Sequence, residues 1–171
     1  MPENNIQNKI DFAKFIIEHN TSLINLADTK AGFVLGSVGI ILGLLFLMNK
    51  ENMTDFTNAG IQVTAILLGW AAIHSFDTLR ARLTKNPPDS AIYFQKISKL
   101  TKKDYQEMVK NMNEETILED YLNNANSISK IQETKFNRLN WSLKVMVMAL
   151  ISLLITVTSY FYDYPAFFTI T

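Results

Sequence analysis

The chain has 171 residues, no net charge at pH 7 and no cysteine, and 48% of its residues are hydrophobic. The lack of cysteine excludes disulfides, thiol nucleophiles and cysteine-based metal sites. No Gly-rich phosphate loop, H-E-x-x-H motif or G-x-S-x-G elbow occurs either, so the sequence predicts no enzyme, no metal and no cofactor.

Residues 5–30 predict an amphipathic helix. Their apolar positions step alternately by four and three, which is the seam of a heptad repeat with Asn20 as its one polar member. Two interpretations stay open: the seam packs against the chain's own middle segment, or it forms a coiled coil with the same helix of other copies of the chain. The seam consists of Ile6, Ile10, Ala13, Ile17, Asn20, Ile24, Ala27 and Ala31.

Three uncharged apolar stretches predict membrane helices. At 1.5 Å per residue, each forms a helix of roughly 27–30 Å, which is enough to cross the hydrocarbon core. Lipid offers no partner for backbone N–H and C=O groups, and no stretch alternates at period 2, so we expect helices rather than strands of a barrel. The predicted spans are residues 31–49, 58–76 and 145–162.

Small and polar side chains within the spans mark candidate contacts. Gly36 and Gly43 belong to small-x-x-x-small pairs in the first span, and such pairs let two helix backbones approach closely in lipid. Ser152, Thr156 and Ser159 share one face of the third span. This face has two interpretations: a hydrogen-bonded helix contact, or the lining of a narrow water-filled pore.

The segment between the second and third spans predicts short helices followed by a long one. After a Pro-Pro pair, Asp89 or Ser90 can cap a short helix that ends near residue 100. Thr101 predicts the cap of a second helix, over about 102–112. Asn113 predicts the cap of a third, which can continue without interruption through the last span.

Lys and Arg residues are distributed unevenly among the predicted spans and the segments that connect them. Residues 1–30 and 77–144 hold 15 of the 16 basic residues. With three spans these two segments share a side, which the positive-inside rule makes cytoplasmic. The predicted organisation is a cytoplasmic amphipathic helix (1–30), a first span (31–49), an outward loop (50–57), a second span (58–76), a cytoplasmic helical segment (77–144), a third span (145–162) and an outward tail (163–171).

Four short sequence motifs lie at the ends of the predicted spans and in the segment between the second and third spans. They are Leu-Ala-Asp-Thr-Lys-Ala-Gly at 26–32, Asn-Pro-Pro at 86–88, Tyr-Phe-Gln-Lys-Ile at 93–97 with Asp-Tyr at 104–105, and Lys-Phe-Asn-Arg-Leu at 135–139. Together they resemble the membrane effector family of Pycsar antiphage defence, over about residues 20–162. Asp28 and Lys30 match the first motif, and their position at the membrane boundary suggests an ion pair that sets helix geometry rather than a catalytic role.

This resemblance implies an effector in the bacterial inner membrane that perturbs the membrane when a nucleotide signal is sensed. In Pycsar the signal is a cyclic pyrimidine mononucleotide made by a partner cyclase. Related defence systems couple similar small membrane proteins to nucleotidyltransferases that make other signals, oligonucleotides included.

We therefore predict an all-α, homo-oligomeric channel or pore, with a tetramer as the expected assembly. Its expected partners are the lipid bilayer and a nucleotide signal, and not duplex DNA. The alternative is a non-conducting scaffold that anchors a partner enzyme to the membrane. The candidate signal-binding residues are Arg80, Arg82, Lys96, Lys99, Lys103 and Arg138.

Overall fold

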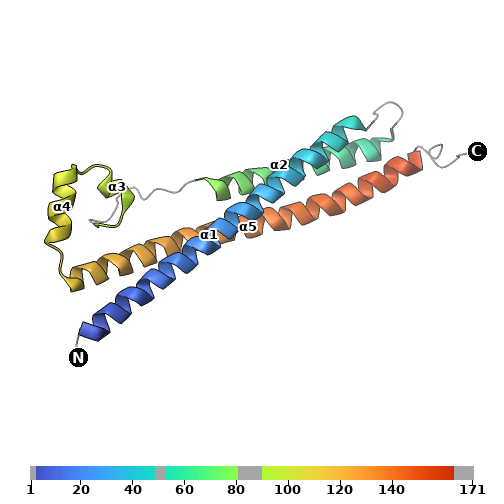
Figure 1. The fold of residues 1–171 in the computed structure, drawn as a ribbon. Coiled ribbons are helices and arrows are strands. Elements are labelled where there is room, and N and C mark those ends of the chain that lie inside the picture. The colour runs from blue at the N-terminus through green and yellow to red at the C-terminus, as the bar shows by residue number, and fades with distance from the viewer. Residues whose placement is uncertain (1–2, 49–52, 81–89, 164–171) are drawn as a thin grey trace, which may run out of the picture. The chain divides into compact units, whose positions relative to one another are not determined.

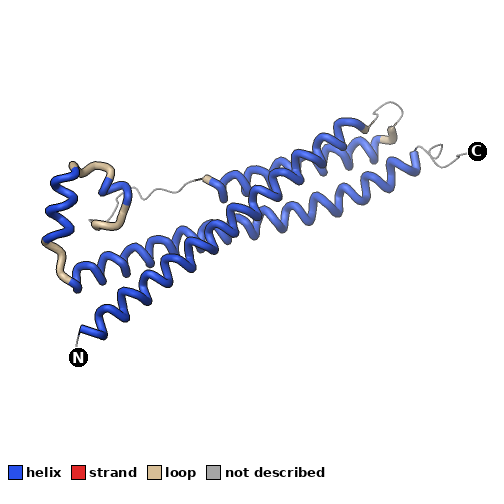
Figure 2. Tube along the Cα trace, viewed as in Figure 1, coloured by secondary structure: helices blue, strands red, loops and turns tan. Residues whose placement is uncertain are grey.

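The computed structural model describes residues 3–48, 53–80 and 90–163, and this part of the chain is all-α, as predicted, with no strand (Figure 2). Three of its helices are long and apolar enough to cross a membrane, which confirms the predicted number of spans at the level of length and composition. The helices are α1 (Glu3–Leu47), α2 (Asp55–Leu79), α3 (Phe94–Ile97), α4 (Lys102–Lys110) and α5 (Glu114–Asp163).

The chain divides into two compact units. One comprises Met1–Leu26 and Ala81–Thr134, and we call it the polar unit. The other comprises Ala27–Arg80 and Lys135–Thr171, and we call it the spanning unit. Helices α1 and α5 each contribute to both units, and the two units are described separately below.

In the polar unit, the heptad seam of α1 packs against α5 of the same chain. Ile10, Ala13 and Asn20 are buried there. The amide nitrogen Nδ2 of Asn20 donates to the hydroxyl of Ser129 over 2.7 Å, which pairs the one polar member of the seam. Of the two open interpretations, the structure therefore favours packing of the seam within the chain itself.

Two predicted helix caps of the polar unit are confirmed. The hydroxyl of Thr101 accepts from the backbone N–H of Asp104 over 3.2 Å and so caps α4. The carbonyl oxygen of the Asn113 side chain accepts from the backbone N–H of Thr116 over 2.8 Å at the start of α5. In both places the side chain satisfies an N–H that the helix itself leaves without a partner.

The predicted helix from residue 90 to residue 100 is wrong in its extent, because only Phe94–Ile97 is helical. The segment before it bonds to other elements instead. The backbone N–H of Ala91 donates to a carboxylate oxygen of Asp120 on α5 over 2.7 Å, and the carbonyl of Ala91 accepts from the Tyr105 hydroxyl over 3.3 Å. These tertiary partners occupy the backbone groups that a helical turn would have used.

In the spanning unit, parts of α1, α2 and α5 lie side by side around an apolar core (Figure 1). Helix α1 supplies Val34, Val38 and Leu45 to this core. The contact between α2 and α5 is closer: a Cβ atom built on Gly60 would lie 2.5 Å from Oγ1 of Thr156. The absence of a side chain at Gly60 therefore makes room for Thr156.

We predict that Gly60→Ala destabilises the protein by about 1–3 kcal/mol, because Thr156 is branched and its Cβ would also lie only 3.3 Å away. Gly69→Ala on the same helix is the matched control, since a Cβ there meets nothing within 4 Å. It should be neutral or stabilise by up to ~1 kcal/mol through helix propensity. Unfolding in detergent measures both changes, and equal stability of the two variants would contradict the close contact.

Candidate functional site

A continuous small and polar face of α2 packs against α5. The buried residues of α2 step alternately by four and three along its whole length, which is the spacing of one helix face. Apart from Ile61 and Leu68, all of them are small or carry a hydroxyl. The face consists of Thr57, Ile61, Thr64, Leu68, Ala71, Ser75 and Thr78.

Three hydroxyl pairs join this face to α5, and we call them, with Gly60 and Thr156, the hydroxyl seam. The end members on α2 lie 18 residues apart, which is roughly 27 Å of helix, close to the thickness of the hydrocarbon core. The pairs are Thr57 with Ser159 at 2.6 Å, Thr64 with Ser152 at 2.8 Å and Ser75 with Ser142 at 2.6 Å.

Two of these hydroxyls also donate to backbone carbonyls, and this fixes the direction of two of the three pairs. Thr64 donates to the carbonyl of Gly60 over 2.8 Å, so in its pair Ser152 must be the donor. Ser142 donates to the carbonyl of Ala71 over 2.9 Å, so Ser75 must donate to Ser142. In these two pairs each hydroxyl hydrogen is therefore used once.

The sequence-predicted pore or interface residues fall into two groups. Ser152, Thr156 and Ser159 lie in the contact with α2, where Thr156 is 1% exposed and the other two are half-buried. Gly36 and Gly43 lie on the exposed face of α1, and a Cβ at either one would meet nothing within 4 Å. The serine and threonine face thus has a partner within the chain, whereas the glycine face is open.

Two ion pairs connect α5 to the other two helices of the spanning unit. Lys135 Nζ lies 2.5 Å from a carboxylate oxygen of Asp28 on α1, and the lysine side chain is only 6% exposed. Arg138 lies 2.6 Å from a carboxylate oxygen of Asp77 on α2, and these two side chains are 31% and 42% exposed. One turn of α5 therefore ties together α1 and α2.

The first ion pair joins two of the motifs that the sequence singled out. Asp28 belongs to the motif at 26–32 and Lys135 to the motif at 135–139. Lys30, the other charged member of the first motif, is exposed. The sequence predicted an ion pair at this boundary but did not identify Lys135 or Asp77 as its members. For Asp77 the signal was a charge immediately after the second span.

The candidate signal-binding residues are spread over both units. Lys96 lies on α3, Lys99 lies two residues after the end of α3, and Lys103 lies on α4; all three belong to the polar unit. Arg80 is exposed at the end of α2, and Arg138 is engaged with Asp77. Arg82, like the Asn-Pro-Pro motif, lies outside the described residues.

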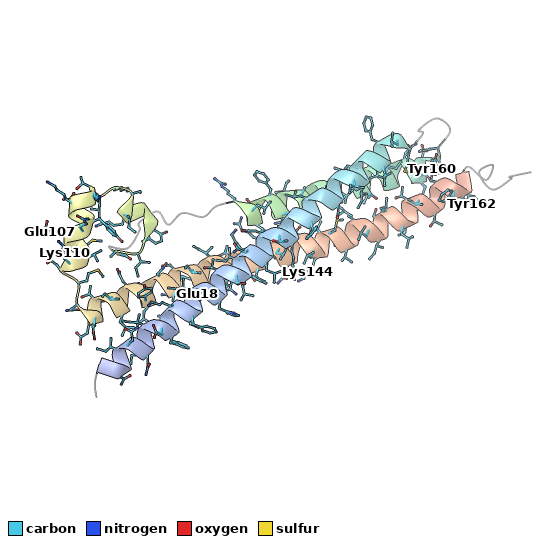
Figure 3. All side chains as sticks on the ribbon, viewed as in Figure 1. Glu18, Glu107, Lys110, Lys144, Tyr160 and Tyr162 are labelled. Atoms are coloured by element: carbon cyan, nitrogen blue, oxygen red, sulfur yellow. The ribbon has the colours of Figure 1, made fainter. Side chains whose placement is uncertain are left out.

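Aromatic side chains mark both ends of the third span. Trp141 is 59% exposed, with the Lys144 ammonium 5.3 Å from its ring centre. Tyr160 and Tyr162 lie near the C-terminal end of α5 (Figure 3). Trp and Tyr favour the two membrane–water interfaces, so this spacing agrees with a membrane position for the stretch between them.

Comparison with known families agrees with this architecture. A family model described as the Pycsar effector protein domain, PycTM, matches residues 12–162. The chain belongs to the Pycsar effector family. Pycsar effectors are antiphage membrane effectors controlled by a cyclic nucleotide from a partner cyclase, and not a known enzyme domain. No curated protein and no solved structure matches the chain.

For this Pycsar effector we predict that Asp28→Ala costs about 3–5 kcal/mol of stability, because the nearly buried ammonium of Lys135 loses its partner. Lys30→Ala should stay within about 0.5 kcal/mol, because Lys30 is exposed. Thermal unfolding in detergent compares the two. Equal effects of the two substitutions would show that the motif does not act through the pair with Lys135.

Proposed function

We propose that this Pycsar effector is a homo-oligomeric channel or pore of the bacterial inner membrane that a nucleotide signal controls from the cytoplasm. The observation that carries the proposal is the hydroxyl seam. It is a polar track about as long as the hydrocarbon core is thick, in a unit whose exposed side chains are mostly large and apolar.

The seam supports conduction because water can replace every bond in it. Hydroxyl groups that bond to each other in the closed contact can bond to water when the helices part. The exposed polar side chains of the described spans, such as Ser37, Gln62 and Thr158, are scattered and form no comparable track. Ser152, Thr156 and Ser159 would then line the path together with Thr57, Thr64 and Ser75 of α2.

Oligomerisation completes this proposal, because three spans per chain enclose no wide aqueous path. The exposed glycine face of α1 supports a contact between copies. Its glycines step by four, three and four, and a Cβ at each would meet nothing within 4 Å in the chain itself. Small residues let helices approach closely in lipid, where packing drives association. The face consists of Gly32, Gly36, Gly39 and Gly43.

The polar unit is the proposed receiver of the signal. The uneven distribution of Lys and Arg supports a cytoplasmic position for it. Exposed cations such as Lys99 and Lys103 can pair with a nucleotide phosphate as point charges. A bound nucleotide shifts the equilibrium between closed and open forms only by its difference in affinity for the two.

A disulfide across the seam tests the proposed path. The chain has no cysteine, and the paired oxygens of Thr64 and Ser152 are 2.8 Å apart, so Thr64→Cys with Ser152→Cys places two thiols in reach of each other. In liposomes containing the oxidised double variant, cyclic UMP or cyclic CMP should drive no ion flux. A reductant should restore the flux that the cysteine-free protein shows with the same nucleotides.

Each single cysteine variant is the control: it cannot form the disulfide, so the same oxidant should leave its own flux unchanged. Full flux through the cross-linked protein would exclude the seam as the path. No flux from any variant with either nucleotide, together with an unchanged membrane potential in cells that express the protein, would favour the non-conducting scaffold.

We predict that Gly36→Leu with Gly43→Leu reduces the oligomer to smaller species, because leucine side chains hold the helices of neighbouring copies apart. Gly69→Leu, at a glycine of α2 with equally open surroundings, is the matched control. Native mass spectrometry in detergent gives the number of subunits. An unchanged oligomer would place the contact between copies on another face.

A further inference from the structure

The two ion pairs lie next to the cytoplasmic end proposed for the hydroxyl seam. Arg138 is four residues before Ser142 on α5, and Asp77 is two residues after Ser75 on α2. The Asp77–Arg138 pair therefore extends the α2–α5 contact by about one turn beyond the last hydroxyl pair.

The bonds within the seam are individually weak. Hydroxyl pairs between membrane helices contribute little, because each hydroxyl has an alternative acceptor on its own helix. Thr64 and Thr156 already bond to backbone carbonyls of their own helices, at 2.8 Å each. The contact between Arg138 and Asp77 is charge-assisted, and such contacts are stronger than hydrogen bonds between neutral groups.

The two ion pairs differ in how easily they can separate. The Lys135 ammonium is 6% exposed, so removing Asp28 from it would leave a nearly buried charge without a partner. Arg138 and Asp77 are 31% and 42% exposed, so water can reach both groups when they part. Separation at this end is thus easier between α2 and α5 than between α1 and α5.

We propose that the Asp77–Arg138 pair is a latch that keeps the hydroxyl seam closed, while the Asp28–Lys135 pair keeps α1 joined to α5 when the latch opens. This regulation rests on the proposed channel function. It assigns Arg138 to the gate rather than to the signal-binding site. Helix α2 is then the element that moves, and release of Asp77 from Arg138 is the step that admits water to the seam.

Cysteine labelling tests the latch without relying on ion flux. The substitution Ser152→Cys introduces a single cysteine into a chain that has none. Ser152 is half-buried and bonds to Thr64, so the cysteine replaces a residue of the closed contact. In liposomes without nucleotide, a water-soluble maleimide should label it slowly. Adding Arg138→Glu should raise the labelling rate at least about tenfold, because two carboxylates then repel each other where the ion pair stood.

The exchanged pair, Asp77→Arg with Arg138→Asp, separates the latch from a simple loss of charge. It restores the attraction with the partners reversed, so labelling should return to the slow rate. Lys130→Glu is the matched control: it reverses an exposed charge of α5 that lies in no ion pair of the described chain, and it should leave the rate unchanged. A fast rate in the exchanged variant, or a slow rate with Arg138→Glu, overturns the latch.

Two further measurements keep the result clear. If Arg138→Glu fails to insert, Arg138→Gln removes the attraction without adding repulsion, and it should also speed labelling if the latch exists; a slow rate overturns it. Parallel flux measurements separate the two proposals. Fast labelling of the Arg138 variants without flux in any variant supports the latch and contradicts the channel. Nucleotide-driven flux, with a labelling rate that is the same for every residue at position 138, supports the channel and contradicts the latch.

Discussion

A hydroxyl group in the hydrocarbon core must find its hydrogen-bond partner within the protein, and this requirement determines how α2 meets α5. Lipid supplies neither donors nor acceptors. Thr57, Thr64 and Ser75 face α5, where serine hydroxyls lie within 2.8 Å of each of them. The close approach at Gly60 follows from the same contact, because hydroxyls bond only when the two backbones are near.

Charged groups at the boundary of the spans also need partners within the protein, and a buried charge without a partner costs more free energy than an unpaired hydroxyl. A nearly buried ammonium such as that of Lys135 is tolerated only with a counter-charge, and Asp28 supplies it from a position 107 residues away. The two family motifs at 26–32 and 135–139 are therefore two sides of one contact. This gives a physical reason for a charged motif immediately beside an apolar span.

The sequence correctly predicted those features that depend only on residues close to one another in the chain. Charge-free length identified three spans, and side chains such as Thr101 and Asn113 identified helix starts, because a cap acts on its own first turn. The heptad seam of α1 was also visible, since periodicity shows which residues share a face.

Periodicity does not show what that face meets. The seam of α1 was compatible with the chain's own middle segment and with a second copy, and the face with Ser152 was compatible with a helix contact and with a water-filled pore. The short helix expected from residue 90 failed for a related reason, because the carboxylate of Asp120, far along the chain, binds the backbone of Ala91. Each of these outcomes depended on a partner distant in sequence.

The α2–α5 contact is formed largely by hydroxyl groups, and this composition would suit a contact that has to open and close. A seam of leucine and valine would be stable when closed, but its separated faces would repel water. In the observed seam the hydroxyl groups bond to one another, and the same groups can bond to water once the helices separate. Closed and open forms can then differ by a small free energy, which a few charged contacts at one end are able to control.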